Sequence, residues 1–128
     1  TKVWAFKCNN QMKGIKIHAD FAAVNVNFWI TPDSANLNKN TGGLLIWDKE
    51  APKNWNFDKY NNDHQEKKNF LKKKKSKMKK IKYKSNRVVI FNSNLFHSSD
   101  NFTFKKNYES RRINITLLYG KRENMKKK

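Results

Sequence analysis

The sequence is poor in cysteine, proline, glycine and acidic residues. Its single cysteine, Cys8, excludes an intramolecular disulfide framework and a cysteine-rich zinc site. No apolar run approaches the ~18 residues that a membrane-spanning helix needs, so we expect no membrane partner and a cytoplasmic location. The 128 residues amount to about one domain. The chain opens at Thr1, without Met or a signal-peptide pattern, and we expect it to be a piece of a longer protein.

The scarcity of acids leaves a large positive charge. There are 29 Lys and Arg residues against 10 Asp and Glu residues, a net charge of +19. Such a surface attracts polyanions, and nucleic acid is the first partner to consider. Only four of the cations are arginines, the residue type that reads bases and phosphates with a bidentate fork. A Lys- and Asn-rich composition also follows from an AT-rich coding sequence, so a nucleic-acid partner stays open without being favoured.

Aromatic residues, at 13% of the chain, and short apolar or alternating segments make up for the modest hydrophobic content. We expect strands at 3–8, 14–18, 23–31, 42–47, 88–91 and 112–119, and a shorter one at 102–104. Alternation within 23–31 places Asn25, Asn27 and Trp29 on one face, whereas the run at 88–91 predicts a buried strand. Short strands separated by turns predict a mainly β domain, either a sandwich or a barrel.

Residues 51–86 have a different character, because they contain the lysine runs 72–75 and 77–80. A block of like charges repels itself and is usually solvated. We therefore expect an exposed insertion between core strands, helical or irregular over 66–80, in which His64 is exposed. Residues 81–83 can resume the sheet. With the basic tail, 121–128, the whole chain from 1 to 128 forms one domain.

Two of the three histidines stand in a suggestive pattern. His18 and Asp20 are one residue apart, and His97 follows a strand and a turn much later in the chain. On an extended chain a one-residue gap puts both side chains on the same side. Two imidazoles and one carboxylate form the facial triad of non-haem Fe(II) oxygenases, which leaves open positions on the metal. Taken as an isolated match, the spacing of His18 and Asp20 is also typical of a partly exposed His beside a turn-forming Asp.

The last predicted strand adds to this pattern. Arg112 shares one face with Asn114 and Thr116, and Arg111 lies on the opposite, apolar face. A polar stripe of this kind suits the interior of a barrel that holds a ligand, because the arginine fork pairs both oxygens of a carboxylate. The solvent face of an edge strand would show the same stripe, so both interpretations remain open.

Four segments in this order resemble the Fe(II)- and 2-oxoglutarate-dependent oxygenase superfamily: HADFAAVNVNFWIT, TGGLLIW, RVVIFNSNLFHSS and RRINITLLYG. The resemblance covers nearly the whole chain outside the Lys-rich insertion. TGGLLIW is similar to the glycine-led strand of the phytanoyl-CoA hydroxylase-like branch, and RRINIT to the R-x-N-x-T strand of the nucleic-acid demethylase branch. The resemblance implies a double-stranded β-helix, or jelly roll, with the site in its mouth.

The resemblance also implies the site. Fe(II) would be held by His18, Asp20 and His97, with 2-oxoglutarate and dioxygen as cosubstrates. Arg112 would bind the distal carboxylate of 2-oxoglutarate, and Arg111 is the competing choice because the doubled arginine leaves the register ambiguous. Further cosubstrate candidates are Asn25, Asn27 and Asn114; Trp29 and Trp47 pack the barrel or line the substrate mouth. The implied activity is hydroxylation of a small molecule or a protein side chain, with release of succinate and carbon dioxide.

Three alternatives compete with this hypothesis. One is a nucleic-acid dealkylase of the same superfamily, which needs an aromatic pocket for a flipped base that the sequence does not locate. The second is a jelly-roll binding module without catalysis. The third is a non-enzymatic, basic nucleic-acid-binding protein that uses the Lys-rich insertion.

Overall fold

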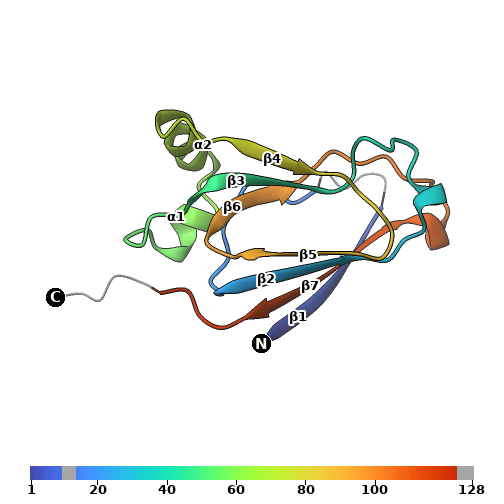
Figure 1. Cartoon of the computed structure of the whole chain (residues 1–128), viewed down its shortest axis with the longest axis horizontal. Coiled ribbons are helices and arrows are strands. Elements are labelled where there is room, and N and C mark those ends of the chain that lie inside the picture. The colour runs from blue at the N-terminus through green and yellow to red at the C-terminus, as the bar shows by residue number, and fades with distance from the viewer. Residues whose placement is uncertain (10–13, 124–128) are drawn as a thin grey trace.

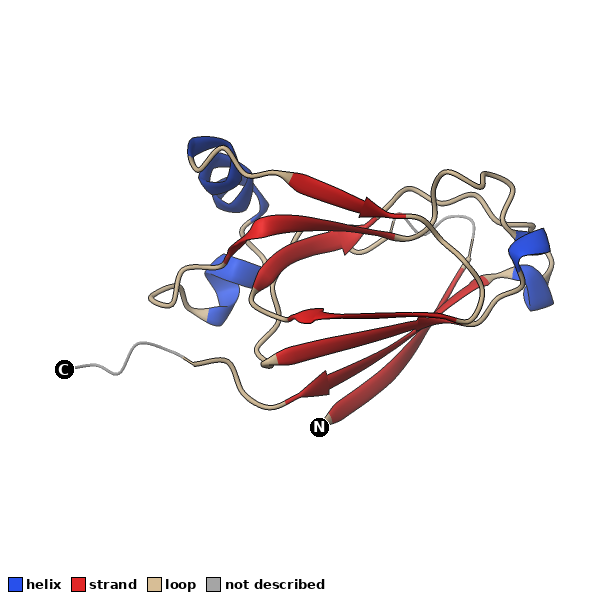
Figure 2. Cartoon of the chain, in the orientation of Figure 1, coloured by secondary structure: helices blue, strands red, loops and turns tan. Residues whose placement is uncertain are grey.

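Two antiparallel β-sheets face each other in a computed structural model, which describes residues 1–9 and 14–123 (Figure 1). The larger sheet has the order β1-β7-β2-β5 and the smaller sheet the order β4-β3-β6. The strands are β1 (Lys2–Cys8), β2 (Val24–Trp29), β3 (Leu44–Glu50), β4 (Met78–Ile81), β5 (Arg87–Asn92), β6 (Leu95–Ser99) and β7 (Arg112–Tyr119). Helices α1 (Phe57–Asn61) and α2 (His64–Lys73) lie at one end of the sheets (Figure 2), and 3-10 turns form at Asp33–Ala35 and Tyr108–Ser110. The expectation of a mainly β domain is confirmed.

The inner face of the larger sheet carries a polar stripe on β2 and β7. β2 and β7 are antiparallel neighbours in which Asn27 lies opposite Thr116 and Trp29 lies opposite Asn114. Both strands alternate between buried and less buried residues, as the sequence predicts, and Arg112 is only 2% exposed. The polar stripe is therefore an interior face and not the solvent face of an edge strand.

Aromatic residues hold the two sheets together. Trp29 is fully buried and stacks on Tyr83, with ring centroids 5.4 Å apart. Phe104 meets the edge of the same tyrosine ring at 5.0 Å, and Leu44 completes the buried cluster. The Tyr83 hydroxyl donates a hydrogen bond to the Thr31 carbonyl at 2.7 Å, which satisfies its polar end inside the core.

The glycine pair before β3 is required by close backbone contacts. Gly42 has a φ of +95°, which side chains rarely adopt, and a Cβ at Gly43 would lie 1.9 Å from the Ile81 carbonyl oxygen. These glycines let the chain pass against β4 while their own carbonyls turn toward the interior, where they meet Arg112.

The insertion at 51–86 is more than an exposed loop. Tyr60 of α1 and Leu71 of α2 are buried against Ala19 and Phe96, and Lys67 is also fully buried. Lys67 and Leu71 lie four residues apart and so share one face of α2, while the lysines from 72 to 75 are exposed. The expectation that 66–80 is exposed and outside the sheet is wrong at these two positions and again at β4, which pairs with β3.

Several predicted strands need correction. Of residues 14–18, only His18 forms a bridge, to His97, and of residues 102–104 only Phe104 does, to Asn36. β5 is not buried on both faces, since Ile90 is 68% exposed. β6, which carries His97, is a strand that the sequence did not indicate. Residues 124–128 of the basic tail lie outside the described residues. No helix of the described ranges has the length and apolar character to cross a membrane.

Candidate metal centre

His18 and His97 are brought together by backbone pairing. The His18 N–H donates to the His97 carbonyl at 3.0 Å, and the His97 N–H donates to the His18 carbonyl at 2.9 Å. Directly opposed residues of an antiparallel pair point their side chains to the same side. The two imidazole rings accordingly lie with their centroids 4.3 Å apart.

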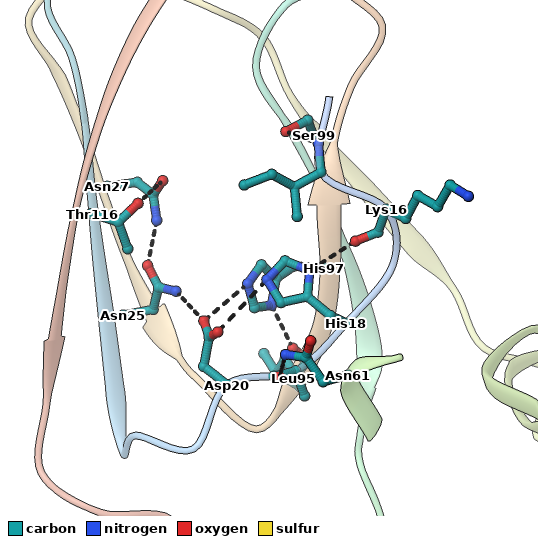
Figure 3. Close-up of polar contacts among 12 residues, drawn as sticks. Lys16, His18, Asp20, Asn25, Asn27, Asn61, Leu95, His97, Ser99 and Thr116 are labelled. Atoms are coloured by element: carbon teal, nitrogen blue, oxygen red, sulfur yellow. Dashed lines mark hydrogen bonds and ion pairs between the residues drawn. The ribbon is translucent and has the colours of Figure 1, made fainter. Parts of the chain in front are cut away.

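Asp20 completes the cluster. Its carboxylate oxygens lie 3.6 Å from His18 Nε2 and 3.3 Å from His97 Nε2 (Figure 3). One ligand atom from each of the three residues lies within 4.8 Å of the others, so the group could hold a metal ion. The predicted convergence of His18, Asp20 and His97 is confirmed by this geometry.

The second nitrogen of each ring shows which atoms are available to a metal. His18 Nδ1 lies 2.8 Å from the Lys16 carbonyl oxygen, and His97 Nδ1 lies 2.9 Å from the Leu95 carbonyl oxygen. A carbonyl oxygen can only accept, so each Nδ1 carries a proton and donates it. Both Nε2 atoms then face Asp20, and a metal ion would bind between these nitrogens and the carboxylate. Backbone carbonyls behind the ligand histidines are the usual way that proteins orient such rings.

A polar network fixes the Asp20 carboxylate from the other side. The Asn25 side-chain N–H₂ donates to Asp20 Oδ2 at 2.7 Å, and Asn27 in turn contacts the Asn25 side chain. Thr116 Oγ1 lies 3.4 Å from Asn27 Oδ1, which links β2 to β7. Figure 3 shows Asn25, Asn27 and Thr116 on the opposite side of Asp20 from the imidazoles.

The electrostatics of the cluster favour ligands over protons. Burial, together with the neighbouring His97, lowers the pKa of His18 to about 4, so His18 is neutral near pH 7. Burial alone would raise the pKa of Asp20, but its contacts with His97, His18 and Asn25 outweigh burial and hold it below its usual range. A neutral imidazole beside an ionised carboxylate is the protonation state that binds metal.

The insertion braces the segment between the two ligands. The Ala19 N–H donates to the Tyr60 carbonyl at 3.1 Å, and the Asn61 side chain donates to the Ala19 carbonyl at 3.4 Å. The Lys67 ammonium donates to the Asn61 carbonyl, beneath the same turn. Nothing in the sequence pattern pointed to this role, because the lysine-rich composition hides the inward face of α2.

A cavity of about 430 Å³ lies between the sheets and includes all three candidate ligands in its wall. Its lining also contains Asn25, Asn27, Asn114, Thr116 and Arg112. All the polar positions that the sequence singled out on β2 and β7 therefore face one space together with the metal cluster.

Arg112 is a buried cation without an anion. Its Nε donates to the Gly42 carbonyl at 2.7 Å, and one terminal nitrogen lies 3.5 Å from the Gly43 carbonyl. Among residues 1–9 and 14–123 no carboxylate forms an ion pair with it, and Asp100 instead pairs with Lys80 at 3.1 Å. Arg111 turns away, with its guanidinium over the Tyr108 ring. Of the two arginines, only Arg112 lines the cavity.

The aromatic lining of the cavity differs from the expectation. Trp29 is buried in the core, where its Nε1 donates to Asn114 Oδ1 at 2.9 Å, and Trp47 packs near Phe96. Neither tryptophan lines the cavity, so of the two alternatives for Trp29 and Trp47 the structure shows packing in the core and not a place in the substrate mouth. Trp4 and Phe6 of β1 line it instead. Their pairing with β7, opposite Thr116 and Asn114, puts them on the same inner face; the sequence-based prediction missed them, although alternation along 3–8 places both on one face of the strand.

Comparisons with protein-family models, with curated proteins and with solved structures found no match for this chain. The site must therefore be interpreted from its own geometry.

Proposed function

We propose that this chain is an Fe(II)- and 2-oxoglutarate-dependent dioxygenase domain. The observation that carries the proposal is a single cavity whose wall holds both a two-histidine, one-carboxylate cluster and a buried arginine without an ion-pair partner among the described residues. A metal ion would compensate the buried carboxylate of the cluster, and a bound carboxylate would compensate the buried guanidinium of the arginine.

The strand order supports a jelly roll. The chain crosses between the sheets several times: β1, β2, β5 and β7 belong to the larger one, and β3, β4 and β6 to the smaller one. The segment at 15–18 runs along the free edge of β6, through the His18–His97 bridge and the hydrogen bond from Ser99 N–H to the Ile15 carbonyl at 2.9 Å. Counted as an eighth strand, it gives two four-stranded sheets, as in a jelly roll.

The donor set suits Fe(II). His18, Asp20 and His97 occupy one side of the site and leave the cavity side open to further ligands, which is the arrangement of non-haem Fe(II) oxygenases. When bound, iron and 2-oxoglutarate would supply oxidation of a substrate by dioxygen, with formation of succinate and carbon dioxide. The protein positions these groups and excludes water around them.

The arginine suits the distal carboxylate of 2-oxoglutarate. Along the inner face of β7, Thr116, Asn114 and Arg112 follow one another away from the metal cluster. The carbonyls of Gly42 and Gly43 hold the guanidinium in place, and its remaining N–H groups suit a bidentate carboxylate. Asn114 donates to Thr116 Oγ1 at 2.9 Å and accepts from Trp29, so its amide orients the wall rather than a ligand.

The proposal is tested by anaerobic calorimetry of 2-oxoglutarate binding to the Fe(II)-loaded protein. We expect binding that requires Fe(II), and weaker binding of 2-oxobutyrate, which has the same 2-oxo acid end but no distal carboxylate. Asp20→Asn should abolish the Fe(II) dependence, whereas His64→Asn, which alters a cavity-lining histidine outside the cluster, should keep it. Equal binding of the two acids, or binding that ignores Fe(II), would refute the proposal.

A further inference from the structure

A second hollow adjoins the metal cavity. Its volume is about 320 Å³, and it shares Lys16, His64, Ser98 and Ser99 with the cavity wall. Lys68 and Asn101 belong to the hollow alone. We call this feature the basic hollow, defined by Lys16, His64, Lys68, Ser99 and Asn101.

The two walls at the opening of the metal cavity differ in chemistry. β1 is the free edge of the larger sheet and contributes Trp4 and Phe6, whose rings meet edge to face at 6.5 Å. The segment at 15–18 is the free edge of the smaller sheet and contributes Ile15 and Lys16. Because both free edges line the cavity, it opens between an aromatic wall and a wall that continues into the basic hollow.

The basic hollow takes its positive charge from two lysines, Lys16 and Lys68. No acidic residue lines it among the described residues. Partial desolvation lowers the pKa of His64, and the neighbouring Lys67, Lys16 and Lys68 lower it further. Figure 3 shows the Lys16 side chain extending away from Asp20, so its ammonium group is free of the metal cluster.

We propose that the basic hollow binds a phosphate group of the substrate while the reacting part passes between Trp4, Phe6 and Ile15 to the metal centre. Ammonium, hydroxyl and amide groups provide the donors that phosphoryl oxygens accept from. The aromatic wall suits a flat or apolar reacting part. This inference rests on the proposed function for the fate of the substrate, but the phosphate site itself can be measured separately.

The test uses inorganic pyrophosphate as the probe, in calorimetric titrations at 0.15 M salt. Lys16→Gln/Lys68→Gln removes two charges from the hollow, and Lys72→Gln/Lys73→Gln removes two exposed charges from the last turn of α2. The two double variants therefore have the same net charge. We expect the first to lose affinity about tenfold and the second to change it less than twofold. Equal losses would show that the overall charge attracts the anion, and would overturn the proposal.

A single-stranded thymidine oligonucleotide distinguishes the two sources of phosphate. If the hollow variant weakens both probes more than the control variant does, the substrate phosphate belongs to a nucleic-acid strand. If the hollow variant weakens the binding of pyrophosphate more than the control variant does, but weakens oligonucleotide binding no more than the control, the substrate is a small phosphorylated molecule. Both results support the hollow as a phosphate site.

The same proteins separate this inference from the proposed function. Fe(II)-dependent binding of 2-oxoglutarate should be the same in both double variants, since neither changes a metal ligand or Arg112, and the Lys16 carbonyl that accepts from His18 Nδ1 is a backbone group that Lys16→Gln retains. If 2-oxoglutarate fails to bind the wild type, the proposed function fails while the pyrophosphate result still stands. If 2-oxoglutarate binds normally and pyrophosphate affinity falls equally in both variants, only the phosphate site is refuted.

Discussion

His18 and His97 face each other as a backbone-paired couple, each donating its N–H to the other's carbonyl oxygen, at 3.0 and 2.9 Å. Residues 79 positions apart are thus placed by the same hydrogen bonds that hold the edge of the smaller sheet. The two candidate histidine ligands are therefore placed by the backbone pairing of the sheet edge.

Asn25 is expected to tune the metal site without binding the metal. Its side chain donates to Asp20 Oδ2 at 2.7 Å, and loss of such an outer contact typically costs about 10–100-fold in metal affinity. Asn25→Ala should show a loss in this range when Fe(II) or Co(II) is titrated. The matched control is Asn92→Ala, because Asn92 is exposed and bonds Glu50 instead. An Asn25→Ala protein with wild-type affinity would show that Asp20 needs no orientation from this side.

Arg112 and Arg111 offer a matched pair for the cosubstrate. Arg112→Lys replaces a bidentate fork by a point charge and should weaken 2-oxoglutarate binding at least about tenfold. Arg111→Lys should leave the affinity unchanged, because Arg111 lies over Tyr108 and outside the cavity. Anaerobic titration of both variants decides between them. If Arg111→Lys is the one that loses affinity, the assignment of Arg112 is incorrect.

Lys67 predicts a pH dependence of stability. Burial lowers its pKa from 10.5 to about 8, so between these values the unfolded chain binds more protons than the folded one. The contribution of Lys67 to the free energy of unfolding is therefore least favourable below pH 8 and improves as the pH rises to 10.5.

Lys67→Met keeps the length of the side chain and removes this titration. The free energy of unfolding of the variant, relative to wild type, should be highest below pH 8 and should fall as the pH rises toward 10.5. Chemical denaturation across this range measures the difference. Lys68→Met changes an exposed neighbouring position, and its free energy of unfolding should depend on pH in the same way as that of the wild type. If the free energy of unfolding of Lys67→Met showed the same pH dependence as that of the wild type, the Lys67 ammonium would not be desolvated in the folded protein.

The insertion should be needed for stability. Leu71 is buried against the cluster that includes Ala19 and Phe96, and truncation of a buried leucine costs about 2–5 kcal/mol. Leu71→Ala should lower the free energy of unfolding by this amount and weaken metal binding, because the cluster contains the residue between His18 and Asp20. Lys72→Ala, one position later and exposed, should change stability by less than about 0.5 kcal/mol. A Leu71→Ala protein as stable as wild type would show that α2 is dispensable.

The sequence predicted the parts of the fold that local alternation determines. β2 and β7 have a strict period of two, so the buried faces that carry Asn25 and Arg112 follow from the residue order. The spacing of His18 and Asp20 and the later His97 pointed to a metal cluster because few other arrangements use these residue types together.

The parts that the sequence did not predict depend on contacts between distant segments. β6 pairs with β3, and nothing local in LFHSS distinguishes a strand from a loop. The lysines of 66–80 suggested a solvated block, yet one helical face carries Lys67 and Leu71 into the core. Trp29 and Trp47 pack the core, whereas the aromatic part of the cavity wall comes from β1, whose place beside β7 only the tertiary pairing establishes.

The most direct measurement is anomalous X-ray scattering from crystals grown anaerobically with Fe(II), recorded on both sides of the iron absorption edge. We expect one iron peak in direct contact with His18 Nε2, His97 Nε2 and an oxygen of Asp20, with both Nδ1 atoms still bonded to their backbone carbonyls. An iron peak elsewhere in the chain, or none at this cluster at saturating Fe(II), would contradict this expectation.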